Sequence, residues 1–300
     1  MDLSLLKGIY VPIITPVTED EKVDVERLRK QVNYIIEKGV HGILAHGSNG
    51  EFYMFDDDDY ELITRTIVEE TKGRVPVLMG IGAIRTSKAV KLAQMGKRIG
   101  VDGLSVLQPM FLKPTDEELF LYFKEIADSV GDLPVLLYNN PRIGYTISAD
   151  LVEKVAKEVN NIVGMKDSSG DINQLMEFIR RTRNLEFKVF GGKDTMIYAS
   201  LAVGGVGAVC STANMFPEIV TEIYNKYIEG DLKGALDLQY RFNPVRMAQD
   251  KASFPVATKD MANINGMKVG NPVKPSLPSK DNLIEFFKDK MKEADLLIKE

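Results

Sequence analysis

Cysteine and histidine are almost absent from this sequence of 300 residues, which has one cysteine, Cys210, and two histidines, His41 and His46. A single thiol excludes a disulfide framework within the chain and is typical of proteins from a reducing compartment. The three side chains are also too few for the cysteine and histidine clusters that hold metal ions. We therefore expect a cytoplasmic protein with neither disulfides nor a metal site.

Positive charge is in slight deficit, because 38 lysines and arginines face 43 aspartates and glutamates, a formal net charge of −5. This balance gives no basic surface for nucleic acid. The first residues lack the basic start and apolar core of a signal peptide. Residues 195–217 are uncharged over a length that could span a bilayer, but Gly204, Gly205 and Gly207 divide them into a helix, a turn and a strand. We expect a soluble protein with no nucleic-acid or membrane partner.

Short apolar runs alternate with segments of helical period along residues 1–229. Most runs are continuously apolar, as parallel strands covered on both faces are. The helical segments carry apolar stripes, for example Val25, Leu28 and Val32, with Gly39 just past the end. Eight successive strand–helix units predict a closed (β/α)8 TIM barrel, with a doubly wound open sheet as the alternative. The predicted strands are residues 9–15, 42–46, 75–80, 103–107, 135–138, 162–166, 188–191 and 206–210.

The segment after the eighth predicted helix has no strand pattern. Its helical periods cover residues 231–247, 252–263 and 281–299. We therefore predict a catalytic barrel over residues 1–229 and a C-terminal helical subdomain over residues 230–300.

The mostly apolar run that begins at residue 161 ends in Lys166, which is followed by Asp167. An amine at the end of a buried strand is unusual, because burying an ammonium group is costly unless it is paired or deprotonated. A desolvated lysine that loses its proton is the nucleophile that forms Schiff bases with ketones. A structural ion pair with Asp167 is the alternative interpretation.

Other polar or small residues stand at the predicted carboxyl ends of strands, which meet over one site in a barrel. Tyr138 ends the fifth strand, and its phenol could relay a proton to Ser48, which follows the second strand. Gly47 opens the loop of residues 47–51, whose backbone amides could bind an anion such as a carboxylate. Gly191 ends the seventh strand and would leave the mouth of the site open. A tight turn at residues 47–51 and a tyrosine that only packs on its ring are the simpler alternatives.

These residues carry a resemblance to the dihydrodipicolinate synthase / N-acetylneuraminate lyase family of pyruvate-dependent class I aldolases. The resemblance covers nearly the whole chain, and the motifs occur in the family's order. The matching segments are residues 12–16, 47–51, 138–141, 164–168 and 204–207, together with Asn214.

The resemblance implies a Schiff base between Lys166 and pyruvate, with Tyr138 as proton shuttle and Ser48 as its link to solvent or substrate. It also implies that Asn49 belongs to the loop that binds the pyruvate carboxylate and that Val209 lies beside bound pyruvate. The family needs no cofactor beyond the covalent imine and takes pyruvate and an aldehyde as substrates. Its members are usually homotetramers, built as dimers of dimers.

Two departures from the family pattern concern the aldehyde. Phe111 stands where synthases usually carry a relay tyrosine that reaches the neighbouring subunit's site, and a phenylalanine passes no proton. Arg142 follows Pro141 directly, whereas synthases place the arginine that binds the aldehyde's carboxylate one residue later. The run of residues 47–52 resembles the 4-hydroxy-2-oxoglutarate aldolase branch. We therefore predict an aldolase for a 2-oxo acid of the 4-hydroxy-2-oxoglutarate or 2-keto-3-deoxy sugar acid type, with dihydrodipicolinate synthase as the alternative.

Three further interpretations accompany this one. Strand alternation predicts that His46 points into the barrel as a satisfied interior histidine. Lys193 is a second lysine at a strand end, and we expect it to be solvated. Outside the aldolase class, the chain could be a non-catalytic sensor of 2-oxo acids, or a phosphate-dependent isomerase that uses the glycine pairs after strands seven and eight.

Overall fold

The computed structural model describes residues 2–297, and its strands form a closed parallel barrel in the order β1 to β8. Each strand pairs with its sequence neighbours, and β8 closes on β1 through the pairs Gly8–Gly207, Ile9–Ala208 and Tyr10–Val209. The predicted TIM barrel is therefore confirmed. Its strands are β1 Gly8–Pro12, β2 Gly42–Ala45, β3 Val77–Ile81, β4 Gly103–Leu107, β5 Val135–Asn139, β6 Ile162–Asp167, β7 Lys188–Gly191 and β8 Gly207–Val209.

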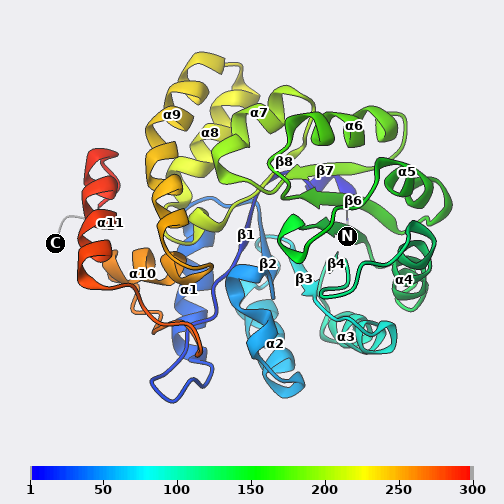
Figure 1. The fold of residues 1–300 in the computed structure, drawn as a ribbon, viewed down its shortest axis with the longest axis horizontal. Coiled ribbons are helices and arrows are strands. Elements are labelled where there is room, and N and C mark those ends of the chain that lie inside the picture. Colours follow the sequence, from blue (N-terminus) through cyan, green and yellow to red (C-terminus); the bar gives the residue numbers. More distant parts are fainter. Residues whose placement is uncertain (1, 298–300) are drawn as a thin grey trace.

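A helix follows each strand, and the helices surround the barrel (Figure 1). Local sequence fixes where they begin. Thr115 and Glu118 form a capping box at the start of the fourth helix, a feature that stabilises a helix by about 1 kcal/mol. The helices are α1 Val25–Glu37, α2 Asp57–Thr71, α3 Thr86–Ile99, α4 Asp116–Asp128, α5 Ala149–Glu158, α6 Ile172–Thr182, α7 Ile197–Ala202 and α8 Pro217–Glu229.

The interior of the barrel is filled by large apolar side chains, as the period of two along each strand requires. Tyr10 and Phe190 meet edge to face with 5.4 Å between their ring centroids. Burial of each such side chain stabilises the fold by roughly 1.5–3 kcal/mol. The other residues of this inner cluster are Leu6, Leu44, Leu78, Leu136, Val163 and Val209.

Three further helices, α9 Leu232–Ala248, α10 Val256–Ile264 and α11 Asp281–Glu293, lie together on one side of the barrel beside α1 and α8 (Figure 1). Phe242 of α9 and Phe287 of α11 belong to the same apolar cluster as the outward-facing residues of β1. The division into units 1–229 and 230–300 stays a prediction. The last predicted helix was too long, because α11 ends at Glu293; residues 298–300 lie outside the described part of the chain.

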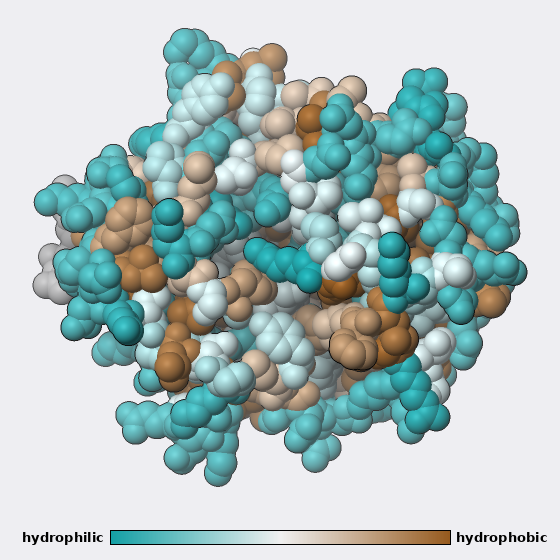
Figure 2. All heavy atoms as spheres, in the orientation of Figure 1, coloured by the Kyte–Doolittle hydropathy of each residue, from teal (hydrophilic) through white to brown (hydrophobic). Residues whose placement is uncertain are grey.

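The surface is mostly polar, but hydrophobic side chains gather over the region of β3, β4 and α3 (Figure 2). The loops after β3 and β4 contribute three large apolar residues to the exposed surface: Ile84, Leu112 and Phe111, of which the last is 95% exposed. None of the described helices has the length and apolar character that crossing a membrane requires.

Candidate active site

A small cavity of about 60 Å³ lies at the carboxyl ends of the strands, where the predicted site residues were expected to meet. Its wall contains Lys166 and Tyr138, together with Asn49, Arg142 and Val209. These five predicted residues come from four strand ends or the loops after them. The barrel therefore brings most of the predicted site into one place.

Lys166 lies on β6, only 5% exposed, directly opposite Tyr138 of β5 in the register of the sheet. Its Nζ atom is 4.2 Å from the centroid of the Tyr138 ring. Among the described residues, no carboxylate lies within 4.0 Å of this amine, so the alternative of an ion pair with Asp167 is wrong. The Asp167 carboxylate instead accepts hydrogen bonds from Asn139 Nδ2 at 2.7 Å and Ser169 Oγ at 2.6 Å.

The phenol of Tyr138 has polar neighbours on two sides. Its oxygen lies 3.5 Å from Ser48 Oγ and accepts a hydrogen bond from Asn140 Nδ2 at 3.2 Å. Burial by itself would raise the pKa of Tyr138, but the charge of Lys166 and the hydrogen bonds of Ser48, Ser168 and Lys166 together lower it below the ordinary value of 10.0. This tyrosine is thus poised to give up a proton more readily than an isolated phenol.

The loop of residues 47–51 follows β2 and contains the short 3-10 helix η2, Ser48–Gly50. The side chain of Asn49 is fixed by a hydrogen bond, which its Oδ1 accepts from Thr258 Oγ1 at 3.0 Å. Gly47 does not line the cavity; a Cβ atom there would come within 2.8 Å of Pro12, so the glycine allows the loop to approach β1 closely.

Of the two glycines at the end of β7, the one that lines the cavity is not the predicted one. Gly191 faces outward against Ser200, whose Oγ would be 2.4 Å from an added Cβ atom, and it does not line the cavity. Gly192 does line it, packed closely on Ser168. The alternation of side-chain directions along a strand accounts for this shift by one residue.

Other residues of the cavity wall were not among the predicted site residues. Asp194 follows β7, and Ser211 follows β8. Ser211 Oγ donates a hydrogen bond to Asp194 Oδ2 at 3.1 Å. Their position after strand ends was the signal that could have found them. Arg246 of α9 and Phe254 come from the helical segment after the barrel, which gives no such signal. Arg142 reaches this side of the cavity, with its guanidinium 4.0 Å from the centroid of the Phe254 ring.

The prediction for His46 was right about burial and wrong about direction. The residue has a left-handed backbone, with φ of 53°, which breaks the alternation along β2. The ring therefore stacks on Tyr60 of α2, and its Nε2 lies 2.9 Å from Thr64 Oγ1, outside the barrel. Burial lowers the pKa of His46 to about 3, so the imidazole is neutral.

The expectation of a solvated Lys193 was also wrong, because this lysine is half-buried and lines the same cavity as Lys166. The cavity therefore presents two amines. Lys166 is the more deeply buried of the two and the one that contacts Tyr138.

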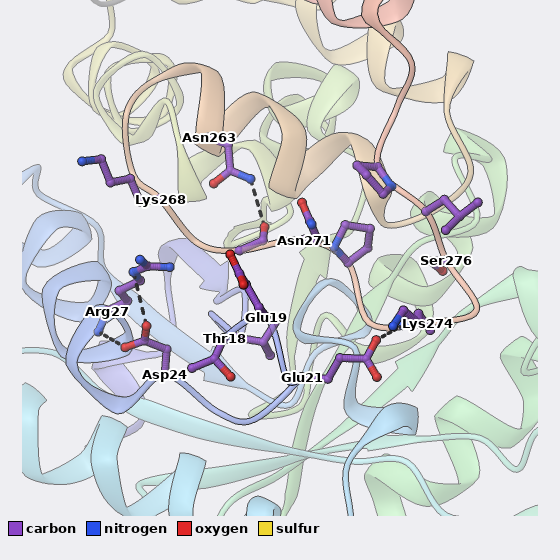
Figure 3. Close-up of a pocket in the computed structure, with 15 residues that line it drawn as sticks. Thr18, Glu19, Glu21, Asp24, Arg27, Asn263, Lys268, Asn271, Lys274 and Ser276 are labelled. Carbon is purple, nitrogen blue, oxygen red and sulfur yellow. Dashed lines mark hydrogen bonds and ion pairs between the residues drawn. The ribbon is translucent and has the colours of Figure 1, made fainter.

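A larger cavity, of about 730 Å³, shares no lining residue with the cavity around Lys166. It lies between the loop after β1 and the segment after α10 (Figure 3). Several of its polar groups already bind one another: Asp24 pairs with Arg27, and Glu21 accepts a hydrogen bond from the backbone of Lys274. No tyrosine is among the described residues that line it, so it lacks the pairing of an amine with a phenol, and we place the chemistry at the smaller cavity.

A buried lysine against a tyrosine, at the carboxyl end of a (β/α)8 barrel, is the arrangement of an imine-forming aldolase. Comparisons with known proteins agree. Residues 5–294 match the Dihydrodipicolinate synthetase family. A 4-hydroxy-tetrahydrodipicolinate synthase from Methanoculleus marisnigri is 37% identical over 280 residues, 92% of this chain and 95% of the relative.

Solved structures show the same likeness. A monomeric dihydrodipicolinate synthase variant superposes with a TM-score of 0.94, at 26% identity and over 99% of each chain. YagE, a prophage protein of E. coli K12 from the dihydrodipicolinic acid synthase family, was solved in complex with pyruvate; its TM-score is 0.93, at 26% identity, over 97% of this chain and 99% of that one. The chain belongs to the dihydrodipicolinate synthetase family. The prediction of an enzyme of the pyruvate-dependent class I aldolase type is confirmed at this level.

Proposed function

We propose that Lys166 is the Schiff-base nucleophile and pyruvate its substrate. The observation that carries this proposal is the buried amine of Lys166, which lies 4.2 Å from the centroid of the Tyr138 ring and has no ion-pair partner among the described residues. The free amine attacks C2 of pyruvate, a C–N bond forms, and the carbonyl oxygen becomes the hydroxyl of a carbinolamine. Loss of that hydroxyl as water leaves a protonated imine.

Tyr138 is the proton shuttle in this proposal. Its phenol gives a proton to the departing hydroxyl and recovers one through Ser48, which lies 3.5 Å away. The imine then withdraws electrons, so C3 loses a proton and becomes an enamine nucleophile. The enamine adds to the carbonyl carbon of an aldehyde, and water finally hydrolyses the imine and frees Lys166. The same steps in reverse cleave a longer 2-oxo acid, and neither direction calls on a metal ion or an organic cofactor.

The pyruvate carboxylate would lie against the loop of residues 47–51, from which Asn49 lines the cavity. Val209 from β8 supplies an apolar wall for the methyl carbon. Gly47 and Gly191 would act through the close packing of their loops, since neither lines the cavity.

For the second substrate we propose a 2-oxo acid aldolase of the 4-hydroxy-2-oxoglutarate or 2-keto-3-deoxy sugar acid type. Phe111 supports this choice, because its ring has no proton to pass at the position where synthases usually carry a relay tyrosine. The names of the curated relatives favour a second candidate, condensation of pyruvate with aspartate semialdehyde by a 4-hydroxy-tetrahydrodipicolinate synthase. A coupled reductase assay with aspartate semialdehyde separates the two.

We further propose a cytoplasmic homotetramer. The exposed apolar side chains of Ile84, Phe111 and Leu112 support self-association, because a patch of this kind is commonly covered in an assembly. One structural neighbour is a monomeric variant, and sedimentation velocity distinguishes a monomer from the proposed tetramer.

Reductive trapping tests the proposal. The protein is incubated with pyruvate and borohydride, and its intact mass is measured for the wild type, Lys166→Ala and Lys193→Ala. We expect one reduced pyruvyl adduct on the wild type and on Lys193→Ala, and none on Lys166→Ala. An adduct that survives in Lys166→Ala and disappears in Lys193→Ala would move the nucleophile to Lys193. Pyruvate binding without any adduct would favour a sensor.

A further inference from the structure

A second cavity, of about 180 Å³, adjoins the one around Lys166. Both cavities are lined by Arg142, Ser211, Arg246 and Phe254, so these residues form the boundary between them. The remaining wall of the second cavity comes from residues 249–258, at the end of α9 and the start of α10. We call it the α9 cavity. The α9 cavity is therefore the space next to the one in which a substrate on Lys166 would lie.

Two side chains in the wall of the α9 cavity each have a buried N–H donor without a hydrogen-bond partner among the described residues. Nε of Arg246 and Nε2 of Gln249 are both unsatisfied, although each residue is only 8% exposed. Leaving a buried donor unpaired costs about 1–3 kcal/mol. Native proteins retain few such groups, and each one calls for an explanation, such as a catalytic role or a water molecule or ion that binds it.

The charged side chains that line both the α9 cavity and the cavity around Lys166 are positive. Arg142 and Arg246 both line the α9 cavity, and among the described residues of its wall only Asp250 carries a carboxylate. Asp250 accepts from Arg246 Nη1 at 3.0 Å, but its own side chain is 64% exposed, so water screens the pair. Asp194, on the Lys166 side, is held by Ser211 and Thr212.

We propose that the α9 cavity binds the end of the second substrate distant from the imine, and that this end carries a carboxylate received by Arg246 and Gln249. The inference rests on the proposed function and narrows it, because it makes Arg246 a specificity-determining residue. Arginine binds a carboxylate through paired N–H groups, and the amide of Gln249 adds a third donor. Aldehydes that end in a carboxylate are then preferred to neutral sugar aldehydes.

Two matched probes test the subsite without requiring turnover. 2-Oxoglutarate carries a carboxylate at C5, and 2-oxopentanoate carries a methyl group there. Dissociation constants are measured by calorimetry for the wild type, Arg246→Met and Arg241→Met. Arg241 lies on the same helix with its side chain exposed, and it is the control for loss of a positive charge.

We expect the wild type and Arg241→Met to prefer 2-oxoglutarate. Arg246→Met should lose about 10- to 100-fold in affinity for 2-oxoglutarate, the range for a hydrogen bond to a charged group, with little change for 2-oxopentanoate. Gln249→Leu should lose less, in the same direction. A wild type that binds both probes equally, or an Arg246→Met variant that weakens both equally, would overturn the subsite.

Reductive trapping with pyruvate on the same variants keeps the two proposals apart. Arg246→Met should trap pyruvate as the wild type does, because its side chain belongs to the other end of the substrate. If pyruvate is not trapped but the probe preference depends on Arg246, the aldolase proposal fails and the subsite stands. If pyruvate is trapped and no preference exists, the subsite fails and the aldolase stands. Unfolding curves of each variant verify that the fold is intact.

Discussion

Lys259 of α10 and Glu51 of the loop after β2 form an ion pair with 2.6 Å between Nζ and Oε2, and their side chains are only 1% and 0% exposed. Further hydrogen bonds complete it: Lys259 donates to the carbonyl of Asn271, and Glu51 accepts from the backbone N–H of Val273. The pair therefore ties the loop that would bind the pyruvate carboxylate to the C-terminal helical segment.

Removing one member of this pair should be strongly destabilising. Lys259→Met leaves an uncompensated carboxylate in the core, and we expect a loss of about 3–5 kcal/mol in the free energy of unfolding, measured in urea. The double variant Glu51→Gln/Lys259→Met removes both charges and keeps an acceptor for Val273, so it should lose less than Lys259→Met alone. If the double variant loses as much as the sum of the single ones, the two side chains are not coupled.

The neighbouring contact, from Thr258 to Asn49, should act on substrate affinity. Thr258→Val keeps the shape of the side chain and removes the donor, so Asn49 loses the hydrogen bond that orients it. We expect KM for pyruvate to rise about fivefold, the equivalent of about 1 kcal/mol, with a small change in kcat. Thr221→Val, which removes a hydroxyl bonded within α8, is the control and should leave KM unchanged.

Sequence periodicity was sufficient to predict the barrel and the position of Lys166, because both depend on local patterns. A continuous apolar run predicts a buried strand, and a polar residue at its end falls at the mouth of the barrel. The direction of His46 could not be predicted this way, since a single left-handed residue reverses the alternation. Arg246 was not predicted either. It lies 80 residues after Lys166 in the sequence, and only the packing of α9 brings it to the cavity.

The lowered pKa of Tyr138 predicts a distinctive titration. Burial dominates for Tyr10, Tyr60 and Tyr122 and raises the pKa of each, whereas Lys166 and the hydrogen-bond partners of Tyr138 lower its pKa from 10.0. A lower pKa means that the phenolate forms at a lower pH than in water. Ultraviolet difference titration should therefore show one tyrosine ionising first, below pH 10.0, and Tyr138→Phe should abolish that step.

The same variant should also slow the chemistry. Without its phenol the carbinolamine loses a positioned proton donor, and we expect Tyr138→Phe to lower kcat about 10²- to 10⁴-fold. Because donation needs the protonated phenol, activity of the wild type should fall on the alkaline side as Tyr138 ionises. An alkaline limb that is unchanged in the residual activity of Tyr138→Phe would assign it to another group.

Phe111 gives a prediction about assembly. Its ring is almost fully exposed and its backbone is left-handed, with φ of 68°, which holds the side chain out from the loop after β4. If the apolar surface of Ile84, Phe111 and Leu112 is covered by a second copy, a charge there opposes association. Sedimentation velocity should show Phe111→Asp shifted toward the monomer, with Tyr240→Asp, at an exposed site on α9, as the control. A wild type that sediments as a monomer would contradict the proposed tetramer.

Asp250 offers a change that should strengthen binding instead of weakening it. Its carboxylate accepts from Arg246 at 3.0 Å and so competes with the carboxylate of a ligand in the α9 cavity. The pair is exposed on the Asp250 side, and such pairs contribute up to about 1 kcal/mol. Asp250→Asn should therefore increase the affinity for 2-oxoglutarate by up to about fivefold and leave that for 2-oxopentanoate unchanged. Weaker binding of 2-oxoglutarate in Asp250→Asn would mean that Asp250 positions Arg246 for the ligand and does not compete with it.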